Sequence, residues 1–469
     1  LTANGISLGN VTWDDSSSGP RSVSLTTTTA LAAGPVALSL ALTSSGADVV
    51  LLDSLTVPDA AIARPHVTPT LERPRPTPPR MGADQLIITY PDLIPALDPL
   101  IAAKQQRGRS VAVADVLAIY DAYGWGERDP EAIRAYLRAV VAGPHPPTSI
   151  LLMGATTTRL RFGPGETDTA LIPPYLLVSD AVYGEIACDT CYARLSAGSP
   201  TTELLPDLPI GRLPASTLAE ATMLIAKTVT ALNPPRGAWR TTALLVADND
   251  RDAAGSPDPA GPFSPLLSDI ATGLPTMQAQ MFVYAPDQPR DDGPYQHAAA
   301  LRTRLFAAWD AGAGLIAYVG HANAWQWAWT GPLEPVADLL ARSDAVRTNG
   351  ARLPILLSMT CLSGSFANPT LTAIDAELLR QSGGGIVAAL TPSGSGVNTG
   401  HARMLTGILP ALRAGHTLGA AHLAGLQALL AQPDDHALVF SYSILGDPDV
   451  TLPLSNPRYS IALPLVQHP

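Results

Sequence analysis

Residues 315–327 read LIAYVGHANAWQW, and residues 355–366 read ILLSMTCLSGSF. Each stretch opens with a short apolar run and then changes to small and polar residues. A run of this kind is typical of a strand that is buried on both faces, as in a parallel sheet. His321 therefore directly follows one expected strand, and Cys361 directly follows another. The two stretches indicate an α/β fold built on a parallel sheet.

Strands and helices alternate on both sides of these stretches. Short apolar strands separated by helices of about ten or more residues are typical of right-handed βαβ units. The alternation starts near residue 85 and restarts near residue 244, so we expect two parallel-sheet units in tandem. The expected strands are 86–89, 111–114, 150–154, 244–248, 281–285, 315–320, 355–360 and 385–390, and the expected helices are 95–107, 130–142, 265–272, 297–311 and 372–381.

The sequence predicts five segments along the chain. Residues 1–62 alternate short apolar runs with Ser, Gly and Thr turns, which indicates part of a β-sandwich module. Residues 63–82 are rich in proline and predict an extended linker. The two α/β subdomains are expected at 83–236 and 237–455, and a C-terminal tail at 456–469.

Composition narrows the class of protein. The chain has 469 residues, of which 46% are hydrophobic and 15% charged, as in a globular protein. The net charge of −11 and the scattered basic residues disfavour a nucleic-acid partner. Since no apolar run approaches the roughly 20 residues of a membrane span, we expect no transmembrane segment. The chain begins at Leu1 without a targeting signal, so we take it to be a processed or truncated piece.

Three cysteines are present, at positions 188, 191 and 361. Cys188 and Cys191 form a CxxC pair with no second pair of ligands nearby, which disfavours zinc. The pair is therefore expected to form a local disulfide or to remain as two buried thiols. In an oxidising compartment, a disulfide would leave Cys361 as the free thiol.

Cys361 and His321 have the positions that nucleophilic chemistry needs. Ligands of open parallel sheets bind at the carboxyl ends of the strands, where both residues fall. A cysteine nucleophile needs a base and backbone N–H groups that receive the developing oxyanion. The order of histidine and then cysteine is also that of caspase-type enzymes. The alternative is that Cys361 is a small buried apolar side chain.

The sequence resembles the gingipain-like cysteine peptidases, whose catalytic domain has the caspase-type fold. The resemblance extends from residue 84 to residue 452 and implies that the second α/β subdomain is the catalytic one. The matching segments, in order, are DQLIIT, IYDAYGWGERDPEAIRAYL, ILLMG, SDAVYGEI, LPDLPIGRLPA, LLVAD, YVGHA, LPILLSMTCLSGSF, GGGIVAAL and LGDPDVTL.

The resemblance implies a catalytic role for each matching residue. His321 would be the general base, and Cys361 the nucleophile that forms an acyl-enzyme. The backbone N–H groups of Cys361 and Ala322 would bind the oxyanion. The family usually has Gly at the position of Ala322. An alanine supplies the same N–H readily where its φ is negative but not where the turn requires a positive φ.

An acidic residue that orients the histidine is also implied, just after the segment LLVAD. Counting along the motif favours Asp250, with Asp248 as the alternative; an Asx turn leaving the strand would explain either one equally well. A calcium ion bound by Asp250, Asp252 and Asp258 is conceivable as a structural ion, although their spacing is not that of an EF-hand. No other cofactor or metal is expected.

The substrate preference implied for basic-specific gingipains does not carry over. The matching stretches, 261–263 and 393–398, contain no charged residue. The stretch 393–398 also contains no aromatic residue. Trp325 and Trp327 could line a substrate cleft, and packing is the alternative. An active peptidase is expected to hold Cys361 as a thiolate near neutral pH.

We therefore expect a secreted or surface-displayed cysteine endopeptidase that acts on proteins or peptides. One alternative is a transpeptidase that attaches proteins to the cell surface, because an amine can resolve an acyl-enzyme as water does. The other is an inactive surface binding or structural protein with the same fold.

Overall fold

The computed structural model describes residues 82–158, 170–180, 182–196, 198–251, 255–287, 289, 293–331, 336–431 and 436–454, together with three two-residue strands near the N-terminus. Those strands, β1 (Thr2–Ala3), β2 (Ile6–Ser7) and β3 (Leu38–Ser39), pair antiparallel in the order β2-β1-β3. The rest of the predicted β-sandwich, most of the predicted linker and the C-terminal tail lie outside the described residues.

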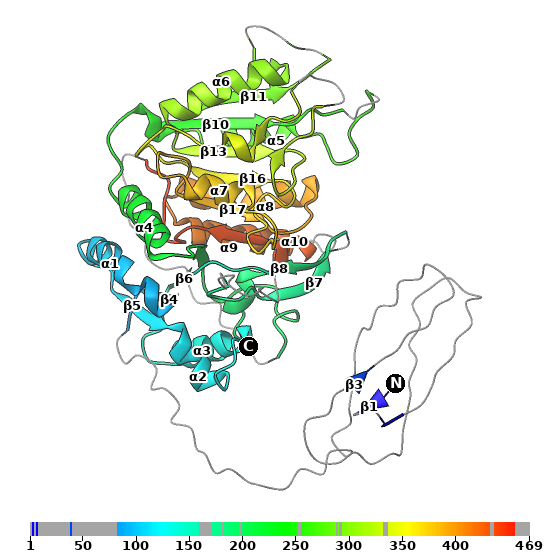
Figure 1. Cartoon of the computed structure of the whole chain (residues 1–469). Helices are drawn as coiled ribbons and strands as arrows, with labels where there is room; N and C mark the ends of the chain where they lie inside the picture. The colour runs from blue at the N-terminus through cyan, green and yellow to red at the C-terminus, as the bar shows by residue number, and fades with distance from the viewer. Residues whose placement is uncertain are drawn as a thin grey trace. The chain divides into compact units, whose positions relative to one another are not determined.

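An eleven-stranded sheet organises the chain from residue 82 onward, in the order β12-β11-β10-β13-β16-β17-β18-β9-β6-β4-β5. Neighbouring strands are parallel except at one junction, where β17 and β18 pair antiparallel. Two parallel half-sheets are thus joined edge to edge (Figure 1). The strands, in sheet order, are Tyr295–Gln296, Gln278–Tyr284, Thr242–Ala247, Leu315–Val319, Ile355–Met359, Ala388–Pro392, Tyr442–Leu445, Ile210–Leu213, Ser149–Met153, Gln85–Thr89 and Val111–Asp115.

This arrangement confirms the predicted tandem parallel-sheet units and adds how they are joined. The last strand, β18, comes from the end of the second unit but pairs with β9 of the first. The described residues from 82 onward belong to one compact unit. The two predicted α/β subdomains therefore share a continuous sheet.

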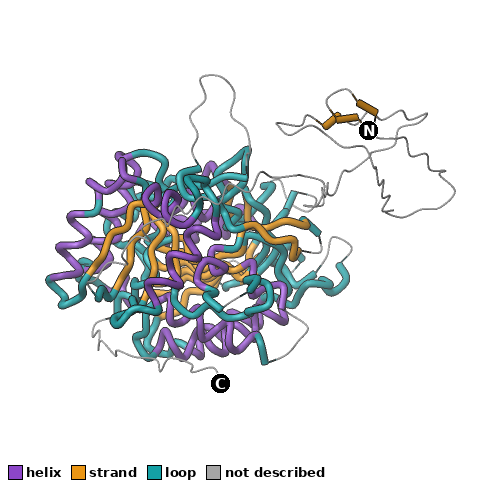
Figure 2. Tube along the Cα trace, turned by 90° about the horizontal axis from the view of Figure 1, so that it is seen from below, coloured by secondary structure: helices purple, strands orange, loops and turns teal. Residues whose placement is uncertain are grey.

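Helices cover both faces of the sheet, as Figure 2 shows. In the second half-sheet, odd and even strand positions face opposite cores: Leu244 and Ile316 pack with α6 and α7, whereas Leu245 and Ala317 pack with α5, α8 and α9. Alternation of this kind explains why the strands read as continuous apolar runs. The helices are α1 (Asp98–Gln105), α2 (Val116–Tyr123), α3 (Pro130–Val141), α4 (Leu218–Leu232), α5 (Ser264–Gly273), α6 (Ala298–Ala311), α7 (Ile374–Arg380), α8 (Asn398–Arg413), α9 (Leu418–Leu429) and α10 (His436–Ser441).

A small hairpin stands apart from the large sheet. Its strands, β7 (Leu176–Asp180) and β8 (Gly184–Ala187), pair antiparallel. Cys188 follows β8 and forms a disulfide with Cys191, which confirms the first of the two predicted alternatives. Cys361 is the free cysteine, as expected.

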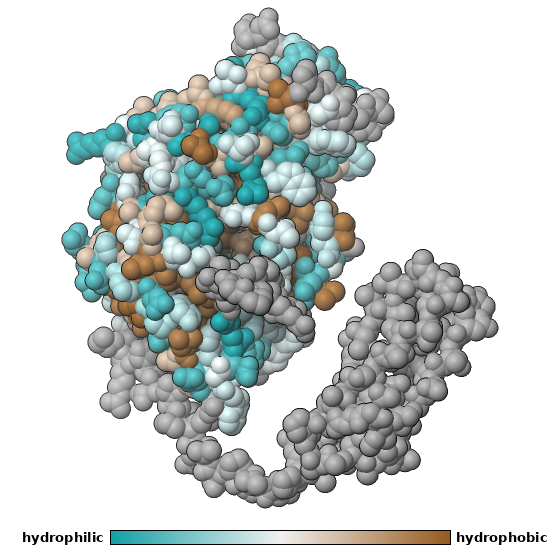
Figure 3. Space-filling model, viewed as in Figure 1, coloured by the Kyte–Doolittle hydropathy of each residue, from teal (hydrophilic) through white to brown (hydrophobic). Residues whose placement is uncertain are grey.

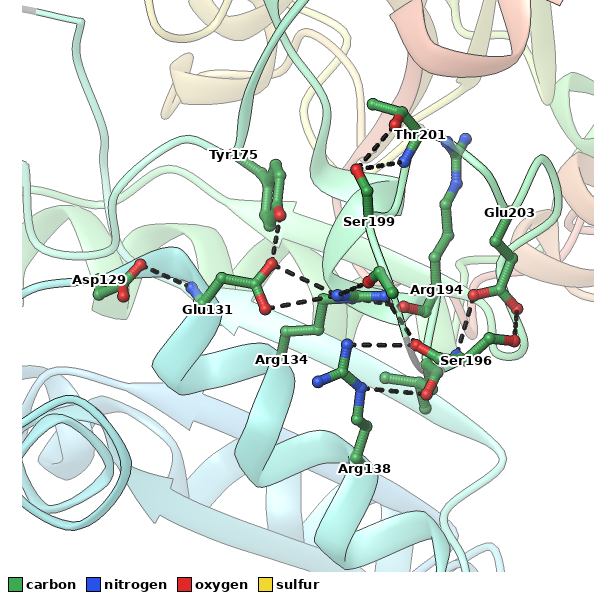
Figure 4. Close-up of polar contacts among 12 residues, drawn as sticks. Asp129, Glu131, Arg134, Arg138, Tyr175, Arg194, Ser196, Ser199, Thr201 and Glu203 are labelled. Atoms are coloured by element: carbon green, nitrogen blue, oxygen red, sulfur yellow. Dashed lines mark hydrogen bonds and ion pairs between the residues drawn. The ribbon is translucent and has the colours of Figure 1, made fainter. Parts of the chain in front are cut away.

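The chain after this disulfide is held against helix α3 (Figure 4). Arg134 of α3 is buried and donates hydrogen bonds to the backbone oxygens of Arg194, Ser196 and Gly198. Its neighbour Glu131 accepts a hydrogen bond from the Tyr175 hydroxyl, directly before β7. The base of the hairpin is therefore fixed to the first half-sheet. Within the part of the chain that the structure describes, no helix is both long and apolar enough to cross a bilayer.

Candidate active site

His321 and Cys361 lie at the carboxyl ends of adjacent parallel strands. Strands β13 and β16 pair in register up to Val319 and Met359, and each candidate residue comes two positions later. Beyond the paired residues, the Thr360 hydroxyl donates to Gly320 O at 2.5 Å, which keeps the two strand ends together. The structure thus brings the two predicted residues to one edge of the sheet.

The Cys361 thiol sits in a tight turn against the loop after β17. Its Sγ accepts a hydrogen bond from the Gly396 N–H at 3.2 Å and donates to Gly396 O at 3.6 Å. Leu362, the next residue, has a φ of +56°, which is uncommon for a non-glycine residue. Burial raises the pKa of the thiol, and the Gly396 N–H opposes that shift. Burial of Cys361 thus disfavours the expected thiolate in the free protein.

The buried carboxylate of Asp375 binds three hydroxyl groups around the turn that holds Cys361. Asp375 Oδ2 accepts hydrogen bonds from the hydroxyls of Ser358 at 2.7 Å, Ser363 at 2.8 Å and Thr391 at 2.5 Å. These hydroxyls belong to β16, to the turn after Cys361 and to β17. One side chain on α7 thereby ties together the elements on both sides of the thiol.

The backbone of His321 is fixed while its ring stays accessible. The backbone N–H donates to Asp248 Oδ2 at 3.2 Å, and the backbone O accepts from the Tyr318 hydroxyl at 2.5 Å. The imidazole is 51% exposed, and its Nε2 lies 3.1 Å from Asp258 Oδ2. The Phe263 ring packs edge-on against it, with centroids 5.2 Å apart. This environment allows the imidazole to exchange protons with a bound molecule.

The carboxylate that contacts the imidazole belongs to Asp258. The two candidates from the sequence, Asp250 and Asp248, make other contacts. Asp250 instead accepts from the backbone N–H groups of Phe263 at 2.6 Å and Ser264 at 3.0 Å, where α5 begins. Asp248 holds the His321 backbone, and burial raises the pKa of its carboxyl to about 6. Asp258 reaches the ring because the chain folds back on itself, with Asp258 N–H donating to Asp250 O at 3.0 Å.

The same contacts bear on the predicted calcium site. Asp250 and Asp258 direct their carboxylates to the start of α5 and to the imidazole, respectively. Asp252 lies outside the described residues. No cluster of three metal-ligating side chains occurs among the residues that the structure describes. The calcium ion stays a prediction without a ligand set in this structure.

Ala322 lies in a short hairpin directly after His321. In the hairpin after His321, Ala328 N–H donates to His321 O and Asn323 N–H donates to Gln326 O. Ala322 pairs with Trp327 between these two bonds, so its own N–H lies outside the ladder. The φ of Ala322 is not positive. Alanine in place of the family's glycine therefore carries no backbone cost here.

The tryptophans after His321 have different environments. Trp327 is fully buried and stacks on Tyr318, with centroids 4.4 Å apart, so it is a packing residue and does not line a cleft. Trp325, by contrast, is 49% exposed. The expectation of a substrate-facing side chain is thus wrong for Trp327 and stays open for Trp325.

The fold defined by this sheet is that of known cysteine proteinases. The structure is similar to the crystal structure of the Arg-specific cysteine proteinase gingipain R (RgpB), with a TM-score of 0.61 and 16% sequence identity, covering 79% of this chain and 78% of that one. It is also similar to the complex of the pro- and mature domains of RgpB from Porphyromonas gingivalis, with a TM-score of 0.58 and 15% identity, over 78% and 79% of the two chains. A comparison with curated proteins found no match.

The sequence itself carries the family assignment. The family model of peptidase family C25 matches residues 79–453, which is most of the chain. The chain belongs to peptidase family C25, and its class is therefore that of the cysteine peptidases.

Proposed function

We propose that this chain is a cysteine endopeptidase in which Cys361 and His321 form the catalytic dyad. The observation that carries the proposal is the register of β13 and β16, which gives the thiol and the imidazole equivalent positions at neighbouring strand ends. Asp258 would orient the imidazole through its contact with Nε2.

The protonation states suggest the order of events. In this proposal Cys361 enters the reaction as a neutral S–H group, the form that burial favours. His321 would accept the thiol proton as Sγ attacks the peptide carbonyl, and would pass it to the leaving amine as the C–N bond breaks. Water then attacks the thioester, giving the free acid and the thiol. The N–H groups of Ala322 and Cys361 would bind the carbonyl oxygen during both attacks.

We propose that the residue before the cleaved bond is uncharged. The two stretches that match the gingipain specificity pocket, 261–263 and 393–398, meet in the structure, since Asn398 Nδ2 donates to Pro262 O at 2.5 Å. Both stretches lack charged residues. Burying an unpaired guanidinium or ammonium group there would cost several kcal/mol.

The disulfide between Cys188 and Cys191 supports a secreted or surface-displayed protein, because disulfides persist in oxidising compartments. We expect protein or peptide substrates, no required cofactor and no nucleic-acid partner.

The test is labelling with electrophilic peptidyl reagents followed by mapping of the modified residue. We expect labelling at Cys361, its loss in Cys361→Ala, and faster labelling by reagents with a neutral residue next to the electrophile. A folded protein that no such reagent labels would contradict the peptidase and favour the inactive binding protein. A transpeptidase would instead give amide products when an amine is added to the cleavage reaction.

A further inference from the structure

The turn of the β7–β8 hairpin is tied to the loop that contacts the thiol. Asp180, at the end of β7, accepts hydrogen bonds from the backbone N–H groups of Val182 and Tyr183, each at 2.8 Å. The same carboxylate accepts from the Ser395 N–H at 2.5 Å and from the Ser395 hydroxyl at 3.0 Å. Gly396, the next residue, donates to Cys361 Sγ. One carboxylate thus fixes the hairpin turn beside the nucleophile candidate.

The other end of the hairpin is also fixed. The Cys188 N–H donates to Tyr175 O at 2.7 Å, and the Tyr175 hydroxyl is bound by Glu131 of α3 (Figure 4). The disulfide from Cys188 to Cys191 follows directly. A hairpin held at its base and its turn presents its side chains in fixed positions, which is what a specificity surface requires.

The turn presents apolar surface next to Cys361. Tyr183 is 55% exposed and Val182 is 74% exposed. Burial, and after it the charge of Asp180, raises the pKa of the Tyr183 phenol, so the ring carries a neutral hydroxyl. Figure 3 shows hydrophobic residues at the surface on the side where Figure 1 places the hairpin. Exposed apolar side chains beside a reactive site are candidates for substrate contacts.

The order of the strands tells on which side of the thiol this surface lies. His321 follows β13, Cys361 follows β16, and Ser395 follows β17, and these three strands are consecutive in the sheet. The hairpin turn is bound to Ser395. The imidazole and the hairpin turn therefore flank Cys361 on opposite sides.

We propose that Tyr183, together with Val182, binds an apolar or aromatic side chain of the polypeptide substrate on the side of Cys361 away from His321. The inference rests on the proposed peptidase function and extends it with a specificity-determining residue. Because the imidazole must reach the leaving amine, the opposite side is left for acyl-side residues beyond the one next to the cleaved bond. Peptidyl reagents, which carry only acyl-side residues, are therefore the appropriate probe.

The experiment compares the rates at which peptidyl reagents with Ala, Leu, Phe or Asp at each acyl-side position label Cys361. The wild-type protein should favour Leu or Phe over Asp at one position. In Tyr183→Ala this preference should fall roughly three- to tenfold, the usual range for one aromatic contact. Tyr183→Phe should retain it, because the ring and not the hydroxyl makes the contact. For cleaved peptides, KM should rise in Tyr183→Ala with little change in kcat.

Tyr295→Ala is the matched control, since Tyr295 is an exposed tyrosine on β12, at the far edge of the sheet. It should behave as wild type. If the wild-type protein is labelled but Tyr183→Ala keeps the full preference, the inference is overturned and the peptidase function stands. A Tyr183→Ala protein that instead loses only self-association would assign the hairpin to a contact between copies and overturn the inference. If no reagent labels the wild-type protein, both the proposed function and the inference fall.

Discussion

Replacing Gly396 with Ala should change two measurable properties, the stability of the protein and the pKa of the Cys361 thiol. A Cβ placed on Gly396 would lie 2.5 Å from His401 Nε2 and 2.5 Å from Thr360 O. Real carbon contacts at such positions are about 1 Å longer, so the loop must move. That movement would draw the Gly396 N–H away from Cys361 Sγ, which it now meets at 3.2 Å.

Two magnitudes follow for Gly396→Ala. Overpacking at a closely packed site typically lowers the free energy of unfolding by about 1–3 kcal/mol. The Gly396 N–H favours the thiolate and lowers the thiol pKa. Losing this hydrogen bond should therefore raise the thiol pKa. A neutral hydrogen bond contributes about 1 kcal/mol, and one to a charged group up to about 3, so losing the N–H should disfavour the thiolate by up to about 2 kcal/mol and raise the thiol pKa.

The assay combines urea unfolding with the pH dependence of Cys361 alkylation by iodoacetamide. Gly383→Ala is the matched control, because a Cβ there would meet only Arg347 O, at 3.4 Å. The control should stay within about 0.5 kcal/mol of wild type and keep the alkylation profile. An unshifted alkylation profile in Gly396→Ala, in a protein whose stability has fallen as expected, would refute the proposed role of the Gly396 N–H.

Three further results are expected. Asp258→Asn should lower kcat/KM by roughly 10²-fold with little loss of stability, whereas Asp250→Asn should chiefly lower stability through the start of α5; equal effects on activity would contradict the assignment of Asp258. Burial lowers the pKa of Lys227 to about 7, against 10.5 unfolded, so urea unfolding should show stability that rises with pH between about 7 and 10, and Lys227→Met should remove that rise. Replacing Cys188 and Cys191 with Ser should lower the free energy of unfolding by about 1–2 kcal/mol yet leave the turnover of folded protein intact, and loss of turnover would implicate the pair in catalysis.

The sequence was sufficient for the sheet and for the two residues at its edge. Buried strands appear in the sequence as apolar runs. The residue after such a run lies at the carboxyl edge of the sheet, independent of the conformation of the loops. This is why His321 and Cys361 could be placed together before the structure was known. The antiparallel junction between β17 and β18 could not be predicted, because nothing local to either strand records the direction of its neighbour.

The carboxylate that contacts the imidazole could not be predicted from the sequence for a related reason. Counting from the strand led to Asp250, but the loop after it folds back and brings Asp258 to the ring. Loop geometry of this kind depends on long-range packing and leaves no periodic signal. The sequence left Trp327 open between a substrate cleft and the core, and its complete burial and stacking on Tyr318 show that it is core.

The position of strand β18 has a consequence for how the protein folds during its synthesis. Residues 442–445 supply the strand that lies between β17 and β9, so each half-sheet has an open edge until residue 445 has been made. The strand is also pinned in place from the far side, where Lys104 of α1 binds Asp447 at 2.7 Å and Asp449 at 2.9 Å. Open edges invite wrong pairing with other chains. A ribosome therefore delivers residues 393–398, the loop that contacts the thiol, before the strand that joins the two half-sheets, and this edge of the sheet can be completed only after residue 445 has been made.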